Sequence, residues 1–142
     1  MKAIYVSELA GRTSSAYRPV RTVMSSPASC VSVTVTLADA LRLMIRRGVR
    51  HLVVLDGSGA CAGVLGDRAI AAAFAADPIG FAESPVGNLL DALPAVVRTD
   101  EQITQVARFM RAAGTDAVAV VDALGNVAGI VTGSDLVGVL SQ

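Results

Sequence analysis

The 142-residue sequence lacks several features that would assign it directly to a class of protein. It has no tryptophan, only 4% aromatic residues, two cysteines and one histidine. So few sulfur and nitrogen ligands exclude the usual metal clusters. Charged residues make up 17% and hydrophobic residues 53%, which excludes a disordered chain. The core must therefore be built mainly from aliphatic side chains.

Neither an excess of charge nor a long apolar run is present. Twelve basic and twelve acidic residues cancel, so there is no broad basic field and nucleic-acid binding is not expected. The longest apolar run, Ala69 to Ala76, is far shorter than the roughly 20 residues of a membrane-spanning helix. Because mean hydropathy is nevertheless high, at +0.58, we expect the surplus apolar surface to face a second copy of the chain in a homodimer.

The cysteine pattern and the N-terminus both favour a cytoplasmic protein. Cys30 and Cys61 lie in or beside apolar runs, which favours buried free thiols over the alternative of a disulfide. The first fifteen residues lack the apolar stretch of a secretory signal.

The sequence matches itself when it is shifted by 66 residues. The match needs no gap from Val20 to Leu65, and it keeps turn and helix-ending residues in place. Identical pairs include Val31 with Val97, Met44 with Met110, Gly48 with Gly114, Asp56 with Asp122, and Gly59 with Gly125. The chain therefore contains two copies of one structural unit.

Each copy has the pattern strand, helix, strand, strand, helix. In the first copy, residues 31–35 alternate as in a half-buried strand, and the apolar residues 52–55 indicate a strand buried on both faces. Residues 61–65 predict a further strand, followed by a helix that Asp67 can cap.

The first helix of this copy has clear start and stop signals. Thr36 and Asp39 resemble a capping box, and Gly48 suits a left-handed C-terminal cap. One helix face is apolar, and it consists of Leu37, Ala40, Leu41, Met44 and Ile45.

We predict an α/β (α+β) fold of two tandem βαββα repeats packed with pseudo-twofold symmetry. The first repeat covers residues 20–76 and the second covers residues 86–142, joined by a linker at residues 77–85. Residues 1–19 match neither copy and form an N-terminal extension of unassigned role, in which residues 4–6 are compatible with a strand.

The duplicated pattern resembles a tandem CBS-domain pair, or Bateman module. The resemblance covers residues 20 to 140, and GIVTGSDL, residues 129–136, matches the family's nucleotide motif Gly-apolar-x-Thr/Ser-x-x-Asp. It implies a sensory module that binds AMP, ADP, ATP or S-adenosylmethionine between its repeats, needs no cofactor, and associates into a flat dimer.

The motif residues suit a nucleotide on physical grounds as well. A helix N-terminus offers unpaired N–H groups to phosphate, and the hydroxyls of Thr132 and Ser134 add donors. Gly133 leaves room for a close ligand, and Asp135 can accept hydrogen bonds from both hydroxyls of a ribose. Plain helix capping, with Ser134 as the N-cap, is the alternative explanation.

The resemblance implies that the first repeat supplies the rest of this pocket. Val49 would form an apolar wall for the base, and Arg50 and His51 would contact phosphate. Ser29 and Cys30 would line the pocket at the start of the first strand. Alternatively, Arg50 is a solvated surface charge and His51 a structural histidine.

The corresponding motif of the first copy is degenerate. Gly66 stands where threonine would be, and Ala69 stands where aspartate would be. The facing segment Thr115-Asp116-Ala117 adds an acid where phosphate would need a base. We therefore expect one adenosyl site per chain.

No catalytic constellation is visible, so we do not expect an enzyme. The first hypothesis is a stand-alone regulatory module that reports an adenosine-containing ligand to an unknown effector protein. The alternative is a dimerisation or scaffolding module that has lost its ligand.

Overall fold

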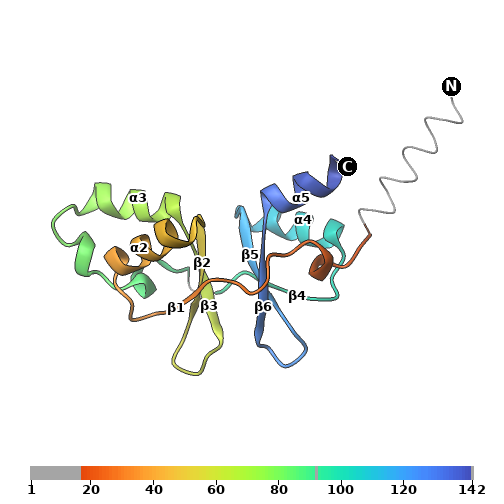
Figure 1. Ribbon diagram of the computed structural model, residues 1–142, viewed down its shortest axis with the longest axis horizontal. Helices are drawn as coiled ribbons and strands as arrows, with labels where there is room; N and C mark the ends of the chain where they lie inside the picture. Colours follow the sequence, from red (N-terminus) through yellow and green to blue (C-terminus); the bar gives the residue numbers. More distant parts are fainter. Residues whose placement is uncertain (1–16, 92, 142) are drawn as a thin grey trace, which may run out of the picture.

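The computed structural model describes residues 17–91 and 93–141. These residues form two sheets of three strands and four α-helices, arranged as two similar halves (Figure 1). The predicted fold class and the two repeats are thereby confirmed. The suggested strand at residues 4–6 lies outside the described residues.

The first half contains the elements β1 (Cys30–Ser32), α2 (Leu37–Arg47), β2 (His51–Leu55), β3 (Cys61–Gly66) and α3 (Asp67–Ala76). Strand β2 lies in the middle of the sheet, parallel to β1 and antiparallel to β3. Helix α2 forms the crossover that a parallel β1–β2 pair requires.

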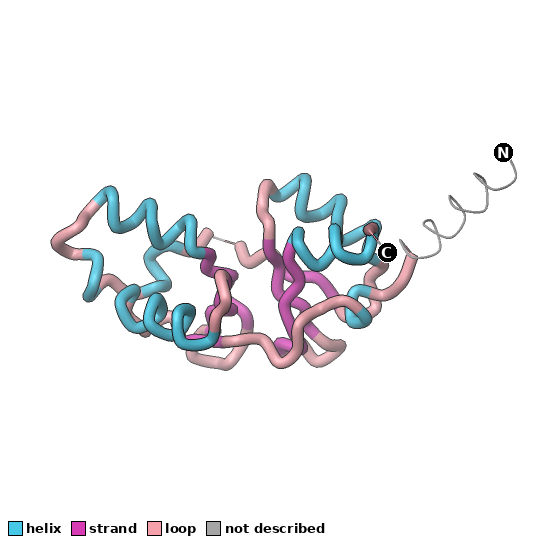
Figure 2. The backbone as a smooth tube through the Cα atoms, turned by 45° about the horizontal axis from the view of Figure 1, so that its top comes forward, coloured by secondary structure: helices cyan, strands magenta, loops and turns pink. Residues whose placement is uncertain are grey.

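The second half repeats this arrangement with β4 (Val96–Arg98), α4 (Ile103–Ala113), β5 (Ala117–Val121), β6 (Val127–Thr132) and α5 (Gly133–Leu140). Its strand pairing is the same, including the register shift near the end of the central strand. The two sheets lie next to each other in the centre of the molecule, and the helices cover the outer sides (Figure 2). Strands β3 and β5 are in contact, so the repeats meet along their sheets.

Each repeat supplies one residue to the hydrophobic core of the other. Val20, in the short 3-10 helix η1 (Val20–Thr22), is fully buried in the core of the second repeat. Val86, at the start of η3 (Val86–Leu89), is fully buried in the core of the first. The segment between η1 and β1 crosses from one half to the other (Figure 1). Each repeat therefore depends on the other for part of its core.

The ends of the first helices follow the sequence signals. The Thr36 hydroxyl accepts a hydrogen bond from the Asp39 N–H at 3.2 Å, so the expected N-cap is present. Gly48 and Gly114 adopt left-handed conformations with φ of 65° and 67°, a region that glycine enters without steric cost.

Three local predictions were wrong. Strand β1 ends at Ser32 rather than at residue 35, because its partner β2 ends at Leu55, the residue paired with Ser32. Ile45 is 73% exposed instead of belonging to the buried face of α2. Asp67 is the first residue of α3 rather than its cap, and the N-cap, Gly66, supplies no side-chain hydrogen bond.

Both cysteines are free and half-buried. Burial is the main cause that raises the pKa of the Cys30 and Cys61 thiols above the ordinary value. Among the described helices, none combines the length and the apolar character needed to cross a membrane.

Candidate functional site

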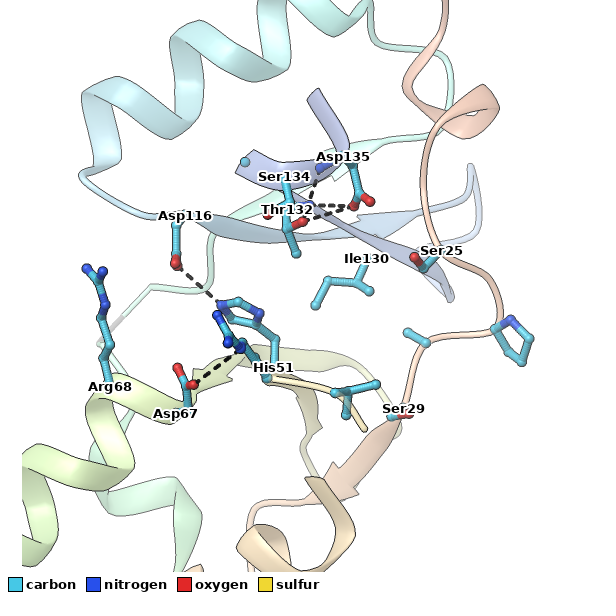
Figure 3. A pocket seen from close by; sticks show the side chains of 15 residues that line it. Ser25, Ser29, His51, Asp67, Arg68, Asp116, Ile130, Thr132, Ser134 and Asp135 are labelled. Atoms are coloured by element: carbon cyan, nitrogen blue, oxygen red, sulfur yellow. Dashed lines mark hydrogen bonds and ion pairs between the residues drawn. The ribbon is translucent and has the colours of Figure 1, made fainter. Parts of the chain in front are cut away.

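A cavity of about 430 Å³ lies between the two repeats (Figure 3). One side is formed by the junction of β6 and α5, and the other by the start of β2 and the segment before β1. The lining residues are Ser25, Pro27, Ala28, Ser29, Val49, Arg50, His51, Asp67, Arg68, Asp116, Ile130, Thr132, Gly133, Ser134 and Asp135.

The structure brings eight of the nine predicted site residues together in this lining. They are Ser29, Val49, Arg50, His51, Thr132, Gly133, Ser134 and Asp135. Cys30 does not line the cavity, because its sulfur turns to the Ala28 carbonyl oxygen, 3.5 Å away. With its raised pKa, the Cys30 thiol is also disfavoured as a thiolate.

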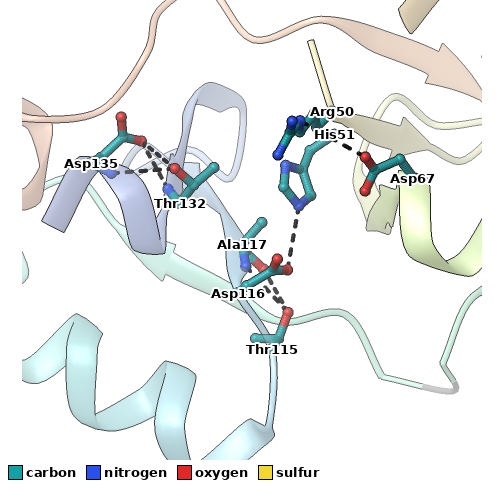
Figure 4. Close-up of polar contacts among 8 residues, drawn as sticks. All are labelled: Arg50, His51, Asp67, Thr115, Asp116, Ala117, Thr132 and Asp135. Atoms are coloured by element: carbon teal, nitrogen blue, oxygen red, sulfur yellow. Dashed lines mark hydrogen bonds and ion pairs between the residues drawn. The ribbon is translucent and has the colours of Figure 1, made fainter. Parts of the chain in front are cut away.

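The junction of β6 and α5 is held by a capping box (Figure 4). The Thr132 hydroxyl accepts a hydrogen bond from the Asp135 N–H at 3.3 Å, and Asp135 Oδ2 accepts one from the Thr132 N–H at 2.8 Å. The N-cap is therefore Thr132 and not Ser134, because a cap accepts from the third residue of its helix. Ser134 is left to face the cavity.

Asp135 lines the cavity, and only one of its two carboxylate oxygens is used in the cap by the described residues. Oδ2 accepts the backbone hydrogen bond and also lies 3.2 Å from Thr132 Oγ1. No described residue donates to Oδ1. Each carboxylate oxygen can accept about two hydrogen bonds, so Oδ1 alone can accept from a pair of hydroxyls. Capping and ligand binding are thus compatible in one side chain, although the sequence presented them as alternatives.

The opposite wall carries two polar contacts (Figure 4). Arg50 Nε lies 4.0 Å from Asp67 Oδ2, a mostly exposed pair of little energetic weight. His51 Nε2 lies 3.3 Å from Asp116 Oδ1, and this contact joins the first repeat to the second. His51 is only 15% exposed, so its ring is held at the boundary between the repeats.

Gly129 of the predicted motif acts through packing. Ser25 and Ile130 exchange backbone hydrogen bonds of 2.9 and 3.0 Å, which bring the crossing segment onto β6. A Cβ at Gly129 would lie 2.6 Å from the Ser25 carbonyl oxygen. Only glycine allows this close approach.

Sequence reasoning missed several lining residues. Ser25, Pro27 and Ala28 reach the cavity through the crossing segment, and no local pattern indicates that crossing. Asp116 could have been found, because it occupies in the second repeat the position of Arg50 in the first. Arg68, which corresponds to Ser134, could have been found in the same way.

A second cleft of about 540 Å³ lies at the pseudosymmetric position. Its lining consists of His51, Val64, Gly66, Arg68, Ala69, Met110, Arg111, Gly114, Thr115, Asp116 and Ala117. The segment Thr115-Asp116-Ala117 faces this cleft as expected, and it brings the acid Asp116. Arg68 and Arg111 outnumber Asp116, because α3 and α4 both contribute a cation.

Comparison with known proteins agrees with this architecture. The sequence profile of the CBS domain matches residues 20–76 and residues 86–142. L-aspartate semialdehyde sulfurtransferase of Methanocaldococcus jannaschii is 27% identical over 117 residues, which are 82% of this chain. The match spans only 22% of that protein's length.

Solved structures with the same fold include other CBS-domain proteins. The CBS domain protein TA0289 from Thermoplasma acidophilum is 28% identical with a TM-score of 0.78, over 88% of this chain and 73% of that one. The CBS domain pair of protein MJ0100, in complex with 5′-methylthioadenosine and S-adenosyl-L-methionine, is 23% identical with a TM-score of 0.79, over 88% and 97%. CBSX2 in complex with AMP is 26% identical with a TM-score of 0.71, over 85% and 94%. Both halves of the chain match the CBS profile, and the chain belongs to the CBS-domain family.

Proposed function

We propose that this chain is a regulatory module that binds an adenosine-containing ligand between its repeats and reports it to a partner protein. The candidate ligands are AMP, ADP, ATP and S-adenosylmethionine. The observation that carries the proposal is the position of Asp135 at the N-terminus of α5, in a cavity that both repeats line. Its Oδ1 accepts no hydrogen bond from the described residues.

The proposed pose follows from the chemistry of the lining. Asp135 Oδ1 accepts hydrogen bonds from the ribose hydroxyls. Val49 and Ile130 provide apolar surface for the adenine ring. The charged end of the ligand points toward Arg50 and His51 on the opposite wall.

The ligands of related proteins support an adenosyl group. Methylthioadenosine and S-adenosylmethionine occupy the CBS pair of MJ0100, and AMP is bound to CBSX2. All three molecules contain adenosine and differ in what is attached to its 5′ carbon. A site that recognises adenosine therefore accounts for the part that these ligands share. The residues of the opposite wall would select among the groups attached to the 5′ carbon.

A regulatory role fits the chain better than catalysis. CBS-domain pairs are generally regulatory, and the match to the sulfurtransferase is confined to a small part of that enzyme. The His51–Asp116 contact spans the repeats beside the cavity. A ligand that changes the spacing of the repeats would change this contact and the outer helix faces, which is how its presence would reach the effector.

We also propose that the chain forms a homodimer. Apolar side chains remain exposed on three helices: Ile45 on α2, Phe74 on α3, and Val137 and Leu140 on α5 are each more than half exposed. A second copy would cover such surface. Analytical ultracentrifugation at micromolar concentration tests this, and a 14.5 kDa monomer would contradict it.

Calorimetric titration and thermal unfolding with each candidate ligand test the adenosyl site. A ligand at 100 times its dissociation constant should add about 2.7 kcal/mol to the stability. Asp135→Asn should weaken binding by about tenfold or more, because charge-assisted hydrogen bonds to the ribose are lost. Asp39→Asn is the matched control, since Asp39 has the same place in helix α2 but lies outside the cavity.

The outcomes separate the two functional hypotheses. Binding of one ligand that is lost in Asp135→Asn and kept in Asp39→Asn supports the sensor. If none of the four ligands binds while the chain remains a dimer, the ligand-free scaffolding module is the better description.

A further inference from the structure

Acidic side chains outnumber the arginines around the cavity that contains Asp135. Its lining has three aspartates, namely Asp67, Asp116 and Asp135, and two arginines, Arg50 and Arg68. Figure 3 shows Asp67, Arg68 and Asp116 on the side of the cavity away from Asp135. A phosphate group is best held by cations that have no acid beside them. The lining therefore has the wrong balance of charge for a ligand with several phosphates.

Two of the acids lie beside the groups of the opposite wall that would meet a phosphate. Asp67 Oδ2 lies 4.0 Å from Arg50 Nε, and Asp116 Oδ1 lies 3.3 Å from His51 Nε2. Arg68 forms no ion pair with an acid within residues 17–91 and 93–141. A phosphate that approached Arg50 or His51 would meet a carboxylate at the same place, and like-charge repulsion would oppose its binding.

The helix N-termini at the cavity have also lost much of their attraction for an anion. The first N–H of α5, that of Gly133, donates a hydrogen bond of 2.9 Å to the Asp116 carbonyl oxygen. The first N–H of α3, that of Asp67, donates one of 3.0 Å to the Arg50 carbonyl oxygen. The first turn of each helix already contains a carboxylate, Asp135 in α5 and Asp67 in α3. These carboxylates offset the positive end of each helix dipole, where a phosphate would otherwise bind.

Asp116 is held in place and still open to a ligand. Its carbonyl oxygen accepts the Gly133 hydrogen bond, and its Oδ1 contacts His51 of the other repeat. Its side chain is nevertheless 69% exposed, and Oδ2 accepts no hydrogen bond in the described part of the chain. An ammonium group can donate to this oxygen, whereas a phosphate oxygen cannot.

We propose that Asp116 determines which 5′ group the cavity accepts on a bound adenosine. With Asp67 it disfavours the phosphate groups of AMP, ADP and ATP, and it favours a 5′ group that carries a cation, as S-adenosylmethionine does. The amino-acid part of S-adenosylmethionine offers an ammonium group to Asp116 and a carboxylate to Arg68. This selection rests on the adenosyl site proposed above.

The test is a calorimetric titration of the full chain with S-adenosylmethionine, methylthioadenosine and AMP at low ionic strength. S-adenosylmethionine should bind more tightly than AMP. Asp116→Asn keeps an acceptor for His51 and removes the charge. It should strengthen AMP binding and weaken S-adenosylmethionine binding by about fivefold each, the scale expected for a mostly exposed charge pair. Methylthioadenosine has no charged 5′ group, so its affinity should stay the same, which also shows that the variant is folded.

Asp122→Asn is the matched control, because Asp116 directly precedes β5 and Asp122 directly follows it, outside the cavity. A preference for S-adenosylmethionine that falls in Asp116→Asn and persists in Asp122→Asn supports the role of Asp116. Tighter binding of AMP than of S-adenosylmethionine, or an equal change of their affinity ratio in both variants, overturns it.

Methylthioadenosine separates this proposal from that of the adenosyl site. If methylthioadenosine binds and AMP is preferred over S-adenosylmethionine, the adenosyl site stands and only the role of Asp116 fails. If none of the three ligands binds, the adenosyl site fails, and the role of Asp116 fails with it.

Discussion

The two clefts have nearly the same backbone and different side chains. Helices α2 and α4 end at Gly48 and Gly114 with φ/ψ angles of 65°/33° and 67°/31°, and the β2–β3 and β5–β6 registers are equivalent. Yet one cleft presents Asp135 and the other presents Ala69. Glycines at helix ends and buried valines are common to both copies of the duplicated fold, whereas the clefts differ at a few positions.

The largest expected effect concerns the exchanged core residues. Val20→Ala and Val86→Ala should each lower the free energy of unfolding by about 2 kcal/mol, because each removes buried methyl groups from a fully packed core. Val137→Ala, at a position 65% exposed, should change it by less than about 0.5 kcal/mol.

Urea unfolding followed by circular dichroism measures all three variants. Because each core contains a valine from the other repeat's segment, both buried variants should unfold in a single transition. Two separate transitions, one for each repeat, would contradict the mutual dependence of the cores.

A smaller effect is expected from making the second cleft resemble the first. Ala69→Asp places a carboxylate in the second cleft at the position that Asp135 has in the first, where it can accept hydrogen bonds from ribose hydroxyls. Adding Gly66→Thr supplies the capping hydroxyl that Thr132 provides at the start of α5. The number of adenosyl ligands bound per chain should then rise from one to two.

The control for this exchange is Ala72→Asp, which adds the same charge to α3 outside the cleft. Calorimetry gives both the affinity and the stoichiometry. A second bound ligand in a variant that combines Ala72→Asp with Gly66→Thr would mean that the charge of the helix, and not its place in the cleft, is responsible.

The smallest expected effect concerns a difference between the turn that joins β2 to β3 and the turn that joins β5 to β6. Asp56 Oδ1 accepts hydrogen bonds from the Ser58 hydroxyl and N–H, which are the main causes that lower the pKa of the Asp56 carboxyl. Within residues 17–91 and 93–141, Asp122 accepts only backbone hydrogen bonds at the equivalent turn, because Leu124 stands in place of Ser58. With a folded-state pKa below the unfolded value, Asp56 stabilises the fold above the unfolded pKa, and the contribution disappears as pH falls through the folded pKa.

Urea unfolding of Asp56→Asn and of the parent chain between about pH 6 and pH 3 tests this sign. The difference in stability between them should shrink on acidification. Ser58→Ala should reduce the pH dependence toward that of a turn without the hydroxyl. A difference that grows at low pH would show that the carboxylate does not stabilise the turn.

The regular parts of the fold were predictable because their signals are local. Thr36 at a helix start and Gly48 at a helix end act within one turn of the chain, and the 66-residue repeat doubled the evidence for each element. The capping residue of α5 is Thr132 rather than Ser134, which the capping alternative named, because the strand extends to Thr132 and the helix begins directly after it.

The composition of the site was only partly predictable. Asp135 and its neighbours belong to one contiguous motif, whereas Ser25 reaches Ile130 across more than a hundred residues of sequence. At the second cleft, Thr115 to Ala117 were predicted as lining residues, whereas the two arginines were not. Arg111 comes from the preceding helix and Arg68 from the other repeat, and only the packed structure brings them to Asp116.

The crossing of residues 23–29, which leaves Val20 in the core of the second repeat, has a consequence for how such a molecule can arise. A polypeptide with one repeat would carry a valine that fits the core of a partner, and it would lack the valine of its own. Such a chain would complete its core only by pairing with an identical chain. The fraction of paired chains would then depend on the protein concentration. Tandem fusion makes this pairing intramolecular, and it frees the two halves to acquire different residues at their clefts.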